Sequence, residues 1–129
     1  MNARDIMTRD VITVNPTMTV KNLAMTLIKN QISGAPVADK SGKIIGIVSE
    51  SDIVAKKGKD VRSIMSKKVI SVGESTPVEE IAQMMTTHHI KRLPVMNDRR
   101  VIGIVSRADI VSAIALGKHV ALHTPVYDL

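Results

Sequence analysis

Two short runs of the sequence place an aspartate three residues after a serine: Ser49 with Asp52, and Ser106 with Asp109. A serine at a helix start can donate a hydrogen bond to phosphate beside exposed backbone amides, and an aspartate in the first turn can accept hydrogen bonds from a sugar diol. One such turn can therefore bind sugar and phosphate together. The same residues would also serve as a plain helix cap with a favourably placed acid.

The surroundings of the two pairs differ in charge. Lys91, Arg92 and Arg107 accompany the second pair and could converge on a phosphate chain, although Lys91 and Arg92 would serve equally as solvated loop charges. Ser51 offers a further hydroxyl beside the first pair, where the second has Ala108. Around the first pair, the positions that correspond to Lys91, Arg92 and Arg107 are occupied by Ser33, Gly34 and Glu50. The second pair is thus better suited to a di- or triphosphate, and the first would be empty or hold a less charged ligand.

Both pairs belong to an internal repeat. Residues 6–14 recur as residues 64–72, and residues 45–54 recur as residues 102–111. Pro36 and Val37 likewise return as Pro94 and Val95. We therefore divide the chain into repeat 1 (residues 1–58), repeat 2 (residues 59–117) and a C-terminal tail (residues 118–129) that could cover its own module or reach a partner.

Each repeat is predicted to fold as strand, helix, strand, strand and helix. The β-branched runs 11–14 and 69–72 predict short strands, and residues 35–48 and 93–105 predict hairpins. Thr19 and Thr76 can cap the first helices, with Pro77 at the first helical position of the second repeat. Ser49 and Ser106 can cap the final helices, which would run to about Lys57 and Leu116. The buried face of the first helix is predicted to hold Val20, Leu23, Ala24, Leu27 and Ile28.

The fold class that follows is α+β, with two β-α-β-β-α repeats packed about a pseudo-two-fold axis. Helices on one face of a small sheet leave apolar surface exposed, and a single copy of this size would be marginally stable. Packing of the two copies against each other would bury the remainder.

Runs 46–52 and 103–109, with Gly, Ser and Asp at matched spacing and each preceded by a Pro-Val strand, resemble the cystathionine-β-synthase (CBS) domain. The resemblance spans about residues 3–116 and implies a tandem CBS pair that binds adenosine-containing ligands in two clefts between the repeats. It also implies homodimerisation. The resemblance implies that Asp52 and Asp109 contact the ribose of the ligand and that Ser49 and Ser106 contact its phosphate. It places the adenine against backbone and aliphatic groups of Ile12, Thr13, Ala35, Pro36 and Val37 in repeat 1, and of Ile70, Ser71, Leu93, Pro94 and Val95 in repeat 2.

Catalysis requires unlike groups that converge, such as a nucleophile with its base, whereas this repeat delivers like groups twice. We therefore expect a binding protein and not an enzyme. We expect no metal site, because His88 and His89 diverge on a helix, and His119 and His123 lack a third ligand.

The net charge of +6 is spread over both halves, and Tyr127 is the single aromatic residue, so no platform exists for stacking bases. The absence of cysteine and of a long apolar stretch favours a cytoplasmic protein without a membrane anchor.

The function predicted from the sequence is a regulatory module. It would bind AMP, ADP, ATP or S-adenosylmethionine and signal to a separate partner protein. Two alternatives stay open: an interaction adaptor whose clefts bind no ligand, and a weak nucleic-acid-binding protein.

Overall fold

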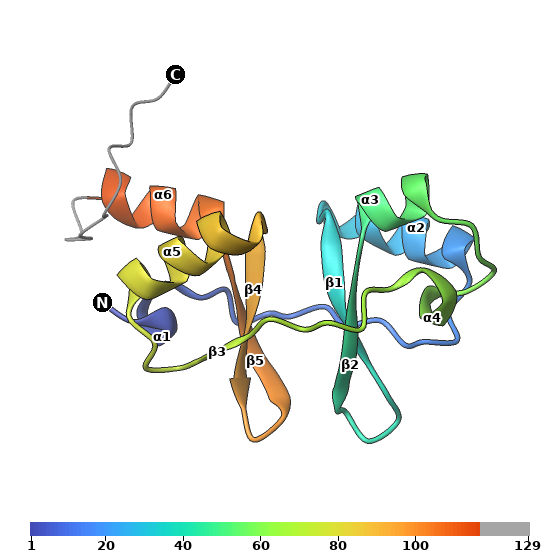
Figure 1. The fold of residues 1–129 in the computed structure, drawn as a ribbon, viewed down its shortest axis with the longest axis horizontal. Helices are drawn as coiled ribbons and strands as arrows, with labels where there is room; N and C mark the ends of the chain where they lie inside the picture. The colour runs from blue at the N-terminus through green and yellow to red at the C-terminus, as the bar shows by residue number, and fades with distance from the viewer. Residues whose placement is uncertain (117–129) are drawn as a thin grey trace. The chain divides into compact units, whose positions relative to one another are not determined.

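The computed structural model describes residues 1–116, which form two compact units that cut across the sequence repeats (Figure 1). We call the unit of residues 12–69 the Asp52 unit. The other, the Asp109 unit, combines residues 1–11 with residues 70–116. Residue 117, the last of the predicted repeat 2, and the predicted tail, residues 118–129, lie outside the described residues.

The Asp52 unit is built on a β-hairpin whose two edges are both hydrogen-bonded. Val14 pairs in parallel with Val37 on one strand, and Ser66 pairs antiparallel with Ile47 on the other. The Val14 N–H donates to the Pro36 carbonyl at 3.0 Å, and the Ser66 N–H donates to the Ile47 carbonyl at 2.8 Å. The elements in chain order are α2 (Val20–Asn30), β1 (Gly34–Ala38), β2 (Ile44–Ser49), α3 (Glu50–Ala55) and α4 (Val61–Ile64).

The Asp109 unit repeats this architecture. Its hairpin is extended by a parallel strand on one edge, and Thr8 forms an antiparallel bridge to Ile104 on the other. Its elements are α1 (Ala3–Ile6), β3 (Val72–Gly73), α5 (Val78–His88), β4 (Arg92–Asn97), β5 (Arg100–Ser106) and α6 (Arg107–Ala115). The strands β3, β4 and β5 lie in that order, with β4 antiparallel to β5. The predicted α+β class and both predicted hairpins are confirmed.

Each unit takes one short helix from the repeat that does not supply its hairpin. Helix α4, which begins repeat 2, inserts Val61 and Ile64 into the core of the Asp52 unit, where both side chains are fully buried. Helix α1 inserts Ala3 into the core of the Asp109 unit in the same way. Neither helix was among the predicted elements, although Asn2 with Asp5 and Asp60 with Ser63 have capping-box spacing.

The glycine of each Ser–Asp run is explained by this exchange of helices. An ideal Cβ on Gly46 would lie 2.7 Å from Met65 Sδ, and one on Gly103 would lie 2.5 Å from Met7 Sδ. Met7 and Met65 directly follow α1 and α4. Glycine therefore lets the exchanged segment lie against the second hairpin strand of each unit, β2 or β5.

Several predicted details are wrong. Residues 11–13 and 69–71 form no strand, and pairing is limited to Val14 and to β3. Helix α3 ends at Ala55, short of Lys57. Ile28 is 79% exposed, because Leu23 and Leu27 fill the core and Ile28 lies one residue further around the helix.

The predicted caps have different outcomes. Thr19 caps α2 as expected, since its hydroxyl accepts from the Asn22 N–H at 3.1 Å. Thr76 does not cap α5, because Pro77 is the N-cap residue and the Thr76 hydroxyl instead accepts from the Gly73 N–H. Within residues 1–116, no helix combines the length and the apolar character that a membrane crossing requires.

Candidate functional site

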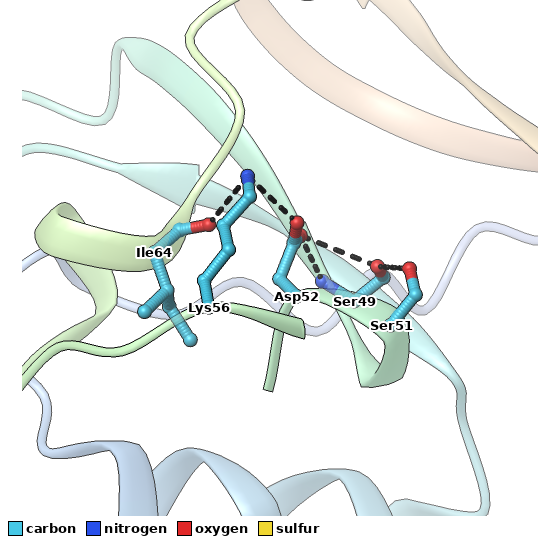
Figure 2. Close-up of polar contacts among 5 residues, drawn as sticks. All are labelled: Ser49, Ser51, Asp52, Lys56 and Ile64. Atoms are coloured by element: carbon cyan, nitrogen blue, oxygen red, sulfur yellow. Dashed lines mark hydrogen bonds and ion pairs between the residues drawn. The ribbon is translucent and has the colours of Figure 1, made fainter. Parts of the chain in front are cut away.

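The Asp52 carboxylate lies in the first turn of α3, directly after β2 (Figure 2). Its Oδ2 accepts from the Ser49 backbone N–H at 2.9 Å and from the Ser49 hydroxyl at 3.2 Å. The Ser49 hydroxyl also lies 2.8 Å from the Ser51 hydroxyl. One carboxylate oxygen is thus committed to the helix cap, and the predicted cluster of Ser49, Ser51 and Asp52 exists within this unit.

The other Asp52 oxygen is held by a lysine that was not among the predicted site residues. Lys56 Nζ lies 3.0 Å from Asp52 Oδ1 and also donates to the Ile64 carbonyl at 3.1 Å (Figure 2). The Asp52 side chain is 15% exposed and that of Lys56 is 44% exposed. The i,i+4 spacing of the two residues was the available signal, because acid and base four apart on a helix face each other.

The Asp109 carboxylate repeats the capping arrangement in the other unit. Its Oδ2 accepts from the Ser106 backbone N–H at 2.8 Å, and the Asp109 backbone N–H donates to the Ser106 hydroxyl at 3.2 Å. Its Oδ1 faces the Thr8 hydroxyl at 3.4 Å. Thr8 was also missed, since it follows α1 and reaches Asp109 through the exchange of helices.

No lysine stands four residues after Asp109. The residue that corresponds to Lys56 is Ala113, which is 3% exposed. The two carboxylates therefore have the same cap and different surroundings.

Two of the three predicted cations lie on adjacent backbone segments. The Arg107 N–H donates to the Lys91 carbonyl at 3.0 Å, which joins the start of α6 to the residue before β4. Both side chains are exposed, and Arg92 is partly buried. The Glu50 N–H donates to the Ser33 carbonyl at 2.9 Å in the same way. The backbone is thus equivalent in the two units, and the charge is not.

The residues predicted to hold adenine fall into two groups. The side chains on the first hairpin strands are all buried, so these strands can offer a ligand their backbone groups; they are Ala35, Pro36, Val37, Leu93, Pro94 and Val95. Ile12 and Ile70 are partly buried, and Thr13 and Ser71 are exposed, in segments without regular secondary structure.

The described part of the chain holds no group of three or more His, Cys, Asp or Glu side chains placed to share a metal ion. What the described site offers is two capped carboxylates, each with hydroxyl groups nearby, and a set of cations on one unit.

Comparison with known proteins places these features in a family. The family model for the CBS domain matches residues 3–58 and residues 61–116. The chain therefore belongs to the CBS-domain family and contains two copies of that domain. L-aspartate semialdehyde sulfurtransferase from Methanocaldococcus jannaschii is 36% identical over 111 residues, which cover 83% of this chain and 22% of that enzyme. The chain thus spans about a fifth of the length of this curated relative.

Two solved structures of CBS proteins share the fold. The CBS domain pair of protein MJ0100, in complex with 5′-methylthioadenosine and S-adenosyl-L-methionine, has a TM-score of 0.85 and 34% identity, covering 92% of this chain and 98% of that chain. CBSX2, in complex with AMP, has a TM-score of 0.85 and 28% identity with the same coverage. The predicted family and the CBS-pair fold are confirmed.

Proposed function

We propose that this chain is a regulatory module that binds adenosine-containing ligands, namely AMP, ADP, ATP or S-adenosylmethionine. The observation that carries the proposal is the pair of helix-start carboxylates, Asp52 and Asp109, each capped through Oδ2 while Oδ1 points to other partners. A carboxylate oriented in this way can accept hydrogen bonds from the ribose diol that all four ligands share. The ligands of the MJ0100 pair and of CBSX2 belong to this chemical class.

The remaining contacts of the proposed site follow from residue chemistry. Ser49, Ser51 and Ser106 would donate to phosphate oxygens or to other polar groups of the ligand, while Lys91, Arg92 and Arg107 would favour a charged phosphate chain near Asp109. Adenine would contact Ile12, Thr13 and the backbone of residues 35–37 in repeat 1. Its contacts in repeat 2 would be Ile70, Ser71 and the backbone of residues 93–95.

A thermal-shift panel of AMP, ADP, ATP and S-adenosylmethionine tests the proposal. A ligand at a hundred times its dissociation constant adds about 2.7 kcal/mol to the free energy of unfolding, so binding should raise the melting temperature clearly. Asp109→Ala and Arg92→Ala should each weaken binding by roughly 1.5–3 kcal/mol, the loss of a charge-assisted hydrogen bond. Glu80→Ala, which removes an exposed acid on α5, is the matched control. No shift with any ligand would favour the adaptor function.

The proposed module is a homodimer. Val54 and Val111 occupy equivalent positions on α3 and α6 and are 87% and 63% exposed. Further exposed apolar side chains lie on the helices of each unit: Met25 and Ile28 on α2, and Ile114 on α6. A second copy would present the same apolar residues, as an isologous interface requires, and covering them would recover the free energy of apolar burial.

Light scattering after size exclusion tests the dimer. The double variant Val54→Glu/Val111→Glu should elute with the mass of one chain, whereas Lys40→Glu, which introduces the same residue in an exposed hairpin turn, should not change the mass. A wild-type protein with the mass of one chain at micromolar concentration would refute this proposal.

The proposed output is a change of conformation that a separate partner protein reads. Ligand binding can produce such a change only if the ligand has different affinities for two arrangements of the module. Ligand-dependent capture of one protein in a pull-down would test this step. A cytoplasmic location is part of the proposal, supported by the absence of cysteine from the sequence.

A further inference from the structure

The two carboxylates differ in how many hydrogen bonds they can still accept. An ionised carboxylate has about four lone-pair sites. In the Asp52 unit three are used, by the Ser49 N–H, by the Ser49 hydroxyl and by Lys56 Nζ. A ribose diol brings two hydroxyl donors, so it can be satisfied at Asp52 only if one of these partners leaves.

Asp109 can accept the same diol without losing a strong partner. Its Oδ2 accepts from the Ser106 N–H at 2.8 Å, and its Oδ1 faces the Thr8 hydroxyl at 3.4 Å, near the upper limit for a hydrogen bond. Two lone-pair sites therefore remain. A threonine hydroxyl can also rotate to accept or donate elsewhere, whereas a lysine ammonium is a donor in every orientation.

Lys56 is held at Asp52 by a second partner. Its ammonium donates to the carbonyl of Ile64, the last residue of α4, at 3.1 Å (Figure 2). Carbonyls in the last turn of a helix lack a partner within the helix, so Lys56 satisfies one of them while it pairs with the carboxylate. Moving the lysine away costs both contacts.

We propose that Lys56 is a specificity-determining residue that competes internally for the sugar-binding carboxylate of Asp52. As a result, the Asp109 site fills first with an adenosyl ligand, and the Asp52 site binds one tightly only when Lys56 is displaced. This inference rests on the proposed function, because it assumes that the aspartates bind ribose.

Isothermal titration with AMP, and separately with S-adenosylmethionine, tests the competition in a background where the Asp109 site is removed. Asp109→Ala should bind weakly or not at all. Asp109→Ala/Lys56→Met keeps a stem of similar length but no charge, and it should bind at least about tenfold more tightly than Asp109→Ala. Adding Asp52→Ala should abolish the gain. Lys57→Met, at the neighbouring exposed lysine, is the matched control and should give no gain.

Two further substitutions keep the test decisive if Lys56→Met unfolds the Asp52 unit. Lys56→Gln removes the charge but keeps a donor for the Ile64 carbonyl, and it should also increase affinity. Lys56→Arg keeps the ion pair and should leave binding as weak as in Asp109→Ala alone. Thermal melts of all variants without ligand report whether each one is folded.

The outcomes separate this inference from the proposed function. If wild type binds through Asp109 and no folded Lys56 variant gains affinity at Asp52, the competition is overturned and the proposed function stands. If neither wild type nor any folded Lys56 variant binds AMP or S-adenosylmethionine, both are overturned.

Discussion

The Asp52 unit and the Asp109 unit share a backbone down to individual hydrogen bonds, so the places where they differ are informative. Both begin the final helix with a capping aspartate, and both pack a methionine of the exchanged segment on a strand glycine. Four residues after the aspartate, however, one unit has a half-exposed lysine and the other a buried alanine. The duplicated fold thus leaves the chemistry at each carboxylate free to differ.

The outer faces of the helices differ as well. Helix α2 exposes Met25 and Ile28, whereas the matching positions of α5 hold Gln83 and Thr86. In the Asp109 unit the additional exposed apolar side chain is Ile114, on a final helix that is longer than α3, and Lys57 stands at its matching place. Beyond the equivalent pair Val54 and Val111, each unit therefore exposes additional apolar side chains on a different helix.

Shortening an isoleucine side chain on α4 or α1 should have the largest effect on stability. The size of the effect should differ between the two units. Ile64 is fully buried, while its counterpart Ile6 is partly buried. Ile64→Ala should lower the free energy of unfolding by about 2–5 kcal/mol through lost burial and a cavity. Ile6→Ala should cost clearly less. Urea unfolding followed by circular dichroism measures both, and equal losses would contradict the difference in burial.

Alanine substitution of Gly46 or Gly103 should lower the free energy of unfolding by an intermediate amount. The loss should again differ between the two units. A Cβ on Gly46 would meet the Ser66 carbonyl oxygen at 2.8 Å as well as Met65, and that carbonyl is fixed by a hydrogen bond to the Ile47 N–H. Near Gly103 the closest atoms all belong to Met7, a flexible side chain.

Gly46→Ala should therefore destabilise by about 1–3 kcal/mol, and Gly103→Ala should fall at or below the lower end of this range. Thermal unfolding compares the two. As a control, Met7→Ala should relieve part of the cost of Gly103→Ala, because it removes the side chain that the new methyl group meets. The comparison fails if Gly103→Ala is the more damaging substitution.

The smallest expected effect concerns the hairpin turns and their response to acid. Asp39 Oδ1 accepts from the Ser41 hydroxyl at 2.7 Å and from the Ser41 and Lys43 backbone N–H groups. The Ser41 hydroxyl is the main cause of a lowered pKa of Asp39, with the backbone N–H groups of Lys43 and Ser41 and the charge of Lys43 contributing. The matching residue in the Asp109 unit is Asn97, which carries no charge.

Because the pKa of Asp39 is lower in the folded state, its stabilising contribution is present above the unfolded pKa of about 3.9 and disappears as the pH falls through the folded value. Asp39→Asn should copy the other turn and flatten the loss of stability slightly between about pH 5 and about pH 3. Urea midpoints across this range measure it. A steeper acid response in the Asn variant would contradict the assigned cause.

The sequence predicted most of what depends on local pattern. The repeat, the hairpins, the start of both final helices and the capped first helix follow from spacing, turn residues and caps, which act within a few residues. The Ser–Asp pairs were recognisable for the same reason, because both members lie in one turn.

The sequence alone determined that the chain is two copies of one unit with a serine and an aspartate at each final helix start. The tertiary structure decided which core receives each short helix. Because α1 and α4 have matching sequences, the sequence pattern cannot assign either helix to a core. The burial of Ala3, Val61 and Ile64 makes that assignment. It also decided the partners of the aspartates, since Thr8 and the Ile64 carbonyl reach them from distant segments. Such contacts depend on packing over long sequence separations, which no local pattern encodes.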